Sequence, residues 1–171
     1  MNYLLTGHPG VGKTTIIKKI IEKLKLPAGG FYTEEIRENN VRTGFAVVTL
    51  SGFKGMLAHR NFKSRHKVGK YGVGVHTLNK IGVTEIELCL VEKKVIVIDE
   101  IGKMELLSPP FQEVVWKALD ADNPVLGTIT LARHPFANKI KERDDVKIYE
   151  VTKQNRDELL KALTKELKKA L

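Results

Sequence analysis

The segment Gly7-His8-Pro9-Gly10-Val11-Gly12-Lys13-Thr14 constrains the fold of this chain more than any other feature. It matches G-x-x-x-x-G-K-[ST], a pattern in which glycines let successive backbone N–H groups point at phosphate oxygens. The apolar run Met1–Thr6 precedes it, and apolar residues at helical spacing follow from Ile16 to Leu24. The sequence therefore predicts a buried strand, a phosphate-binding loop and a helix whose positive end lies at the loop.

Two simpler interpretations of this loop are less satisfactory. A glycine-rich turn that only joins a strand to a helix would not need the Lys13-Thr14 pair. A dinucleotide-binding loop would need a third glycine where Thr15 stands. We therefore expect Lys13 to reach the β- and γ-phosphates of a nucleotide and the Thr14 hydroxyl to bind Mg²⁺.

A second motif lies in Val95-Ile96-Val97-Ile98-Asp99-Glu100, where four apolar residues precede two acids. On its own this pattern often marks no more than the end of a buried strand. Combined with a complete phosphate loop, it resembles a Walker B strand, which places Asp99 beside the bound Mg²⁺. We expect the adjacent Glu100 to polarise the attacking water, with support of Asp99 or Lys13 as the alternative role.

Strands and helices alternate along the rest of the chain, which predicts an α/β fold with a parallel sheet covered on both faces. The helix expected near Leu78–Val91 has an uncertain start, because Gly82 weakens its first turns and Thr84-x-x-Glu87 offers a later capping box. The region of about residues 30–75 is β-rich and is read as an insertion or sheet extension. The other expected strands are 31–37, 41–50, 53–59, 71–75, 124–130 and 147–151, and the other helices are 108–119, 135–143 and about 154 to the C-terminus.

Positive charge is concentrated in one part of the chain, residues 39–84. This segment has eight Lys and Arg residues and no Asp or Glu, which leaves 21 basic and 20 acidic residues elsewhere. Such a basic insert indicates an anionic partner. We favour the triphosphate itself, with Arg42 or Arg60 acting on it, and keep nucleic acid as the alternative.

Composition excludes several classes of protein. The single cysteine, Cys89, rules out an intramolecular disulfide and is expected to be a buried apolar side chain. No apolar run is long enough to cross a membrane, and no secretory signal precedes the loop, so we predict a cytoplasmic protein. At 171 residues we expect one domain, and we predict a monomer. Few Gln, Cys and Met among many Lys and Glu suggest a thermophilic source.

Some other polar residues have a structural and a functional interpretation. Lys103 and Glu105 either reach the site or pair with each other, and Thr128 either senses the γ-phosphate or is an ordinary strand residue. One of Thr33, Glu34 and Glu35 is expected to face the nucleotide. Arg133 is either an arginine finger or a surface residue. Thr152 is expected to be an N-cap, and Asn155 and Arg156 are candidate base contacts.

With the phosphate loop and the acidic strand end together, the chain resembles the small P-loop nucleoside-triphosphatase family known from thermophiles and from humans. The resemblance is carried by GHPGVGKTT at 7–15, GFYTEEIR at 30–37, GFAVVTLSG at 44–52, VIDEIGKMEL at 97–106, LGTI at 126–129 and VTKQNR at 151–156. It implies a three-layer, RecA-like variation of the P-loop fold and hydrolysis of several nucleoside triphosphates with limited base preference.

We therefore hypothesise Mg²⁺-dependent hydrolysis of nucleoside 5′-triphosphates to diphosphate and phosphate. A nucleoside or polynucleotide kinase and a nucleotide-switched nucleic-acid-binding protein are the alternatives, although no arginine-bearing lid and no readout motif is recognised. Lys13 and Glu100 are the candidate catalytic residues, and Thr14 and Asp99 are the candidate metal ligands. The candidate nucleotide-binding residues are Gly7, His8, Pro9, Gly10, Val11, Gly12, Lys13, Thr14, Thr15, Asp99, Glu100, Ile101 and Gly102.

Overall fold

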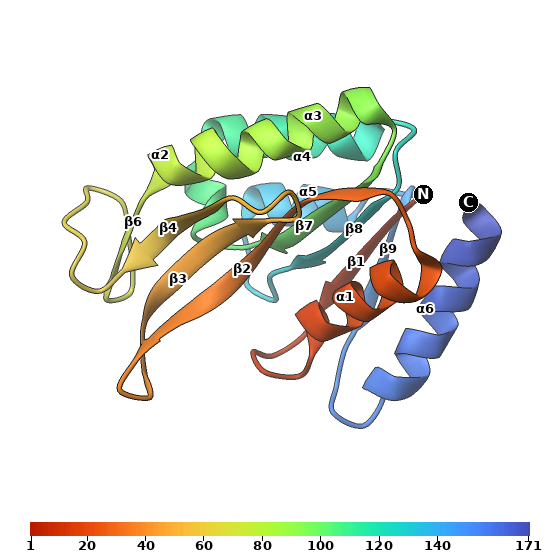
Figure 1. Cartoon of the computed structure of the whole chain (residues 1–171), viewed down its shortest axis with the longest axis horizontal. Coiled ribbons are helices and arrows are strands. Elements are labelled where there is room, and N and C mark those ends of the chain that lie inside the picture. The colour runs from red at the N-terminus through yellow and green to blue at the C-terminus, as the bar shows by residue number, and fades with distance from the viewer.

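Nine strands form a single sheet in the computed structural model, which describes residues 1–171. The strands are β1 (Asn2–Thr6), β2 (Ala28–Glu38), β3 (Val41–Thr49), β4 (Lys54–His59), β5 (Lys67–Val68), β6 (Tyr71–Val73), β7 (Val95–Ile101), β8 (Val125–Ile129) and β9 (Val146–Glu150). Their spatial order is β5-β6-β4-β3-β2-β7-β8-β1-β9 (Figure 1).

The sheet has a parallel part and an antiparallel part. Neighbouring strands from β2 through β7, β8 and β1 to β9 are parallel. From β2 outward, β3, β4, β6 and β5 pair antiparallel. This confirms the predicted α/β architecture, with the β-rich segment extending the same sheet. Because the parallel strands end at one edge, the loop after β1 and the last residues of β7 lie on the same side of the molecule.

Helices cover both faces of the parallel part (Figure 1). One face carries α1 (Lys13–Leu24) and α6 (Arg156–Ala170), which pack against each other. The other face of the parallel part carries α3 (Thr84–Glu92), α4 (Pro109–Asp120) and α5 (Pro135–Lys141). On the same side of the sheet, α2 (Val75–Thr77) lies over β4, and a π-helical stretch, η1 (Leu78–Val83), lies over β3 and β4. A short 3₁₀ turn, η2 (Glu105–Leu107), follows β7.

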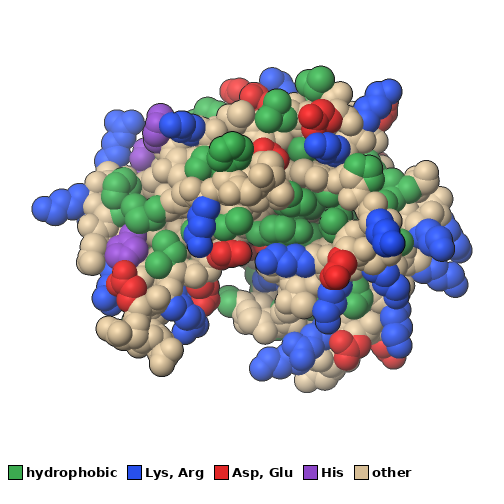
Figure 2. Space-filling view, in the orientation of Figure 1, with side chains coloured by type: hydrophobic (Ala, Val, Ile, Leu, Met, Phe, Trp, Pro, Cys, Tyr) green, Lys and Arg blue, Asp and Glu red, His purple; other side chains and the backbone are tan.

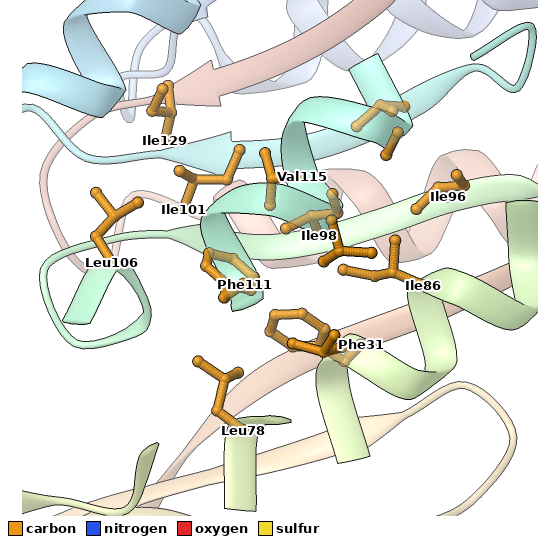
Figure 3. Close-up of a cluster of buried hydrophobic side chains, with 14 of the residues drawn as sticks. Phe31, Leu78, Ile86, Ile96, Ile98, Ile101, Leu106, Phe111, Val115 and Ile129 are labelled. Carbon is orange, nitrogen blue, oxygen red and sulfur yellow. The ribbon is translucent and has the colours of Figure 1, made fainter. Parts of the chain in front are cut away.

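Two hydrophobic cores match these two layers. The smaller core joins Ile16, Ile17 and Ile20 of α1 to Leu163 and Leu167 of α6 through the inner strands. The larger core lies beneath α3 and α4, where the rings of Phe31 and Phe111 meet edge to face at 6.1 Å between centroids (Figure 3). Cys89 is buried in this larger core, as predicted. Burial of these side chains supplies the main favourable term for folding.

Several predicted boundaries change in the structure. The chain is already helical at Val75, and α3 begins at Thr84, the later of the two starts. Val83 before it is helical and no side chain caps α3, so the expected capping box is not formed; Gly82 packs close to the Phe31 ring inside the π-helical stretch. Helix α6 begins at Arg156 rather than near Gln154. The N-cap of α4 is confirmed, since the Ser108 hydroxyl accepts a hydrogen bond from the Phe111 N–H at 3.1 Å.

Membrane-spanning helices are not found: none of the helices combines the length and the apolar character that a bilayer crossing requires.

At Gly30 there is no room for a side chain between β2 and β7. Its φ is +104°, and a Cβ at this position would lie 2.0 Å from the Val97 carbonyl oxygen. Both strands are held in a parallel ladder with Gly30 opposite Val97, so neither backbone can move away. Only glycine fits here.

We predict that Gly30→Ala lowers the free energy of unfolding more than Gly52→Ala does. Gly52 is the matched control, because its φ is +103° but nothing lies within 4 Å of the added Cβ. Gly52→Ala should lose about 1–2 kcal/mol from the left-handed backbone alone. Gly30→Ala should lose at least ~1 kcal/mol more through overpacking. Urea denaturation followed by circular dichroism measures both values, and equal losses would contradict the close approach.

Candidate active site

The phosphate loop connects β1 to α1 as predicted, with positive φ at Gly7, Gly10 and Gly12. Gly7 has no room for a side chain, since a Cβ would lie 2.6 Å from the Val151 carbonyl oxygen of the segment after β9. Gly12 is the N-cap of α1, and no side chain accepts from the first turn of that helix. The N–H groups at this end are therefore directed at the space in front of the loop, where an anion is favoured.

Lys13 lies against this loop. Its ammonium group donates a hydrogen bond of 2.5 Å to the Gly7 carbonyl oxygen, which holds the charge above the loop. His8, Pro9 and Gly10 at the tip are exposed. Val11 instead points into the smaller core, so only its backbone faces a ligand.

Asp99 connects the loop to the end of β7. One carboxylate oxygen accepts a hydrogen bond from the Thr14 hydroxyl at 2.5 Å, and the other accepts from the Thr128 hydroxyl of β8 at 2.6 Å. Thr33 of β2 donates to the backbone oxygen of Asp99 at 2.7 Å. Burial raises the pKa of the Asp99 carboxyl, and the bonds from Thr128 and Thr14 and the charge of Lys13 oppose that rise. Two elements, α1 and β8, thus bond the Asp99 carboxylate, and a third, β2, bonds the backbone of the same residue.

Glu100 faces the same cleft from the next position of β7. Burial raises the pKa of its carboxyl above the ordinary value; the nearby Lys13 lowers it and Asp99 raises it. Gly102 makes room for this side chain, because a Cβ there would lie 2.5 Å from a Glu100 carboxylate oxygen. Ile101 is fully buried and takes part in the larger core, so it offers only its backbone.

Glu105 is a buried acid beside these groups, and the sequence left its role open. It begins the turn η2, lines the cleft and is 3% exposed. Burial raises the pKa of its carboxyl well above the ordinary value, and the charge of Glu100 adds to the rise. It does not pair with Lys103, which is exposed and lines the same cleft. Both residues therefore reach the site.

The cleft in front of the loop has a volume of about 600 Å³. The phosphate loop and the end of β7 form one wall, and the antiparallel extension forms the other. On that second wall, Arg42 donates a hydrogen bond of 3.1 Å to the Tyr71 hydroxyl and lies 3.5 Å from a Glu35 carboxylate oxygen. Its guanidinium also lies over the Phe45 ring, at 5.3 Å from the centroid.

The sequence identified one side of this cleft better than the other. Arg42 and Glu35 were among the candidates, but Phe45, Tyr71 and Thr130 were not. A strand pattern shows that Phe45 and Tyr71 are partly apolar positions; it does not show that β3, β4 and β6 bring them to the phosphate loop.

Other candidates lie away from the cleft. Arg60 lines a separate cavity, Glu34 lies 3.8 Å from Lys54 in an exposed ion pair, and Arg133 is an exposed loop residue. Arg156 reaches the loop through a 3.5 Å bond to the Val11 carbonyl oxygen.

The segment after β9 forms a hydrogen-bonded turn. The Asn155 side chain accepts from the Thr152 N–H at 2.8 Å and donates to the Glu150 carbonyl oxygen at 2.8 Å. Thr152 caps this turn rather than the helix itself, since Asn155 is the N-cap of α6. The Asn155 amide is therefore engaged within the protein.

The donors at Asp99 and Thr14 fit a small, hard cation. Both supply oxygen atoms, which Mg²⁺ prefers, and they lie within hydrogen-bond distance of each other. No cluster of three or more His, Cys, Asp or Glu residues is arranged to hold a metal. A cation at this place would therefore need further oxygens from phosphates or water, which is how Mg²⁺ usually binds beside nucleotides.

Comparison with known proteins gives one consistent result. The family model described as NTPase matches residues 2–164. A curated relative, nucleoside-triphosphatase THEP1 from Thermotoga sp. (strain RQ2), is 50% identical over 168 residues, which cover 98% of this chain and 96% of the relative. The crystal structure of THEP1 from Aquifex aeolicus superposes with a TM-score of 0.87 at 39% identity, covering 95% and 96% of the two chains. The solution structure of a human cancer-related nucleoside triphosphatase gives 0.85 at 38%, covering 99% and 98%.

We predict that Glu105→Gln stabilises the protein at pH 8 in buffer without nucleotide or Mg²⁺. A carboxyl whose pKa is raised in the folded state binds more protons there than in the unfolded chain, so stability falls as pH rises from about 4.3. The amide has the same shape and no charge. We expect a higher Tm for the variant by a few degrees, since ~1 kcal/mol corresponds to about 2–4 °C.

The difference in Tm between the parent and Glu105→Gln should shrink as the pH falls towards about 4.3, the ordinary pKa of a Glu carboxyl. Glu113→Gln is the control, because Glu113 is an exposed acid of α4 and should change the Tm little at any pH. Scanning calorimetry at several pH values measures the Tm of the parent and of the two variants. A variant less stable than the parent at pH 8 would show that the Glu105 carboxylate is stabilising.

Proposed function

The chain belongs to the NTPase family, and we propose that it hydrolyses nucleoside 5′-triphosphates to diphosphate and phosphate with Mg²⁺. The observation that carries this proposal is the 2.5 Å contact between Thr14 and Asp99. It joins the helix after the phosphate loop to the acidic strand end, as a site for a metal-bound triphosphate requires.

The phosphate loop would bind the charged part of the substrate. Its backbone N–H groups and the N-terminus of α1 favour phosphate oxygens, and Lys13 brings a positive charge to the β- and γ-phosphates. Thr14 and Asp99 would hold Mg²⁺, which neutralises charge on the phosphate oxygens when it is bound. Thr128 keeps the Asp99 carboxylate oriented through its 2.6 Å bond.

Glu100 is placed to activate water. It faces the cleft one residue beyond Asp99, and burial moves the pKa of its carboxyl upward, in the direction that suits a general base near neutral pH. The carboxylate would orient a water molecule towards the γ-phosphate and accept its proton. Lys13 lies close enough to oppose that rise in the pKa of Glu100.

Limited base preference is part of the proposal. The relatives are named nucleoside-triphosphatases, without reference to one base. In the turn after β9, where we expected base contacts, the Asn155 amide bonds to the backbone. Specific recognition of a base needs several donors and acceptors in place. These bonds hold the Asn155 amide in the turn and occupy part of its hydrogen-bonding capacity, which supports a broad choice among ATP, GTP and other triphosphates.

The function is tested with triphosphates labelled in the γ-phosphate. The purified protein is incubated with each labelled triphosphate and Mg²⁺, alone and with nucleosides or RNA, and EDTA is added to a parallel sample. We expect free labelled phosphate from several triphosphates and none with EDTA. Lys13→Ala should lose both turnover and most triphosphate binding, because the cation above the loop is removed. Label transferred to an acceptor would instead show a kinase.

We predict that Glu100→Gln separates binding from chemistry. The amide keeps the size of the side chain but cannot take a proton, so kcat should fall by about 10²–10⁴. Triphosphate and Mg²⁺ should still bind, as calorimetric titration measures. Asp99→Asn should instead raise the Mg²⁺ concentration needed for half-maximal turnover. The control is Glu113→Gln, at an exposed position of α4, which should leave kcat unchanged.

If Glu100→Gln hydrolyses triphosphates at the normal rate, another acid must activate the attacking water. Glu35 is then the next candidate, because it lines the cleft, whereas Glu34 does not.

A further inference from the structure

A second cavity, of about 610 Å³, lies in the antiparallel extension and shares no lining residue with the active-site cleft. It is formed by the loop between β4 and β5, residues 60–66, together with the hairpin β5–β6. Figure 2 shows Lys and Arg side chains at this end of the molecule, the left end in that view. The lining residues are Arg60, Asn61, Phe62, Lys63, Ser64, Lys67, Lys70 and Gly72.

The positive charges of this cavity are not neutralised. No Asp or Glu occurs between residues 39 and 84, and none of the basic side chains between residues 60 and 70 takes part in an ion pair. In contrast, Arg42 and Lys54 of the same extension are paired with Glu35 and Glu34. Unpaired charges gathered in a concave surface focus the field and attract anions.

The backbone of this cavity is held in place. The Ser64 hydroxyl donates to the Val73 carbonyl oxygen at 2.9 Å and accepts from the His66 N–H at 3.1 Å. A Cβ on Gly72 would lie 1.9 Å from the Phe62 carbonyl oxygen, so the loop packs directly on β6. The wall is therefore built before any ligand arrives. The Lys70 ammonium lies 5.5 Å from the centroid of the Tyr71 ring, and no lysine of the wall forms an ion pair.

The chemistry of the cavity fits a chain of phosphates better than a second triphosphate. A triphosphate normally brings Mg²⁺, and this cavity has no carboxylate to hold that ion. It also has no glycine loop at a helix N-terminus. Lys63, Lys67 and Lys70 carry compact charges on flexible stems, which suit successive phosphodiesters. The Phe62 ring is 38% exposed and can stack on one base.

We propose that this cavity binds the backbone of a single-stranded nucleic acid, with Phe62 stacked on one base. One ring and several Lys and Arg side chains give affinity with little sequence preference. The cavity adjoins the active site through the hairpin: Lys67 and Lys70 line the cavity, while Val68, Gly69 and Tyr71 line the cleft. Binding of the strand does not depend on the proposed hydrolysis.

The experiment measures the fluorescence anisotropy of labelled 12-nucleotide oligo-U and oligo-dT at several salt concentrations. The test variant replaces Lys63, Lys67 and Lys70 by Ser. Its matched control replaces Lys161, Lys165 and Lys168 by Ser, which removes the same charge from the exposed face of α6. Phosphate release from ATP is measured for both variants without oligonucleotide.

We expect the cavity variant to lose at least about tenfold in affinity and the α6 variant less than about threefold. The slope of log K against log salt should fall by roughly 2 in the cavity variant, at about 0.7 for each phosphate no longer neutralised. Phe62→Ala should weaken binding several-fold without changing this slope. If the cavity variant still releases phosphate from ATP, the loss of oligonucleotide binding is separate from the proposed hydrolysis.

Three outcomes would overturn the proposal. Equal losses in the cavity and α6 variants would mean attraction by net charge alone. Tighter binding of a duplex or of heparin at matched charge would identify another polyanion as the partner. Absence of binding at low salt up to 100 µM protein, with phosphate release intact, would reject the site and leave the proposed hydrolysis standing.

Discussion

The buried carboxylate of Asp99 is the constraint on which the rest of the site depends. A carboxylate that is 5% exposed is costly unless hydrogen bonds replace its lost water. Thr14 and Thr128 supply those bonds from α1 and β8, and Thr33 of β2 bonds the adjacent backbone oxygen. Each partner comes from a different element, so the phosphate loop, both neighbouring strands and the end of β7 must be in register for Asp99 to be satisfied.

The order of the strands explains why Thr128, as well as Thr14, bonds the Asp99 carboxylate. Strand β8 lies between β1, which leads into the phosphate loop, and β7, which carries Asp99. Gly127 allows β8 to approach β7 closely, since a Cβ there would lie 2.3 Å from the Ile98 carbonyl oxygen. Thr128, the next residue, then faces Asp99 across the gap. Strand β8, which lies between the strands of the two motifs, thus connects them physically.

The antiparallel extension gives the fold a second wall and divides the positive charge of the insert. Arg42 faces the active-site cleft and is held by Tyr71 and Glu35, whereas Arg60 and the lysines of the following loop surround a separate cavity. One charged segment therefore serves two concave surfaces. Both surfaces use the hairpin β5–β6, because alternate residues of a strand point to opposite sides.

The sequence alone determined the phosphate loop, the acidic end of β7, the α/β fold and the N-cap at Ser108, because each depends on residues that are neighbours in the chain. Only the tertiary structure decided that Thr33, Thr128 and Glu105 surround Asp99 and Glu100, and that Phe45 and Tyr71 face the loop. It also separated Arg60 from Arg42. The physical reason is that strand pairing and helix packing set these distances, and local periodicity carries no information about which strands will pair.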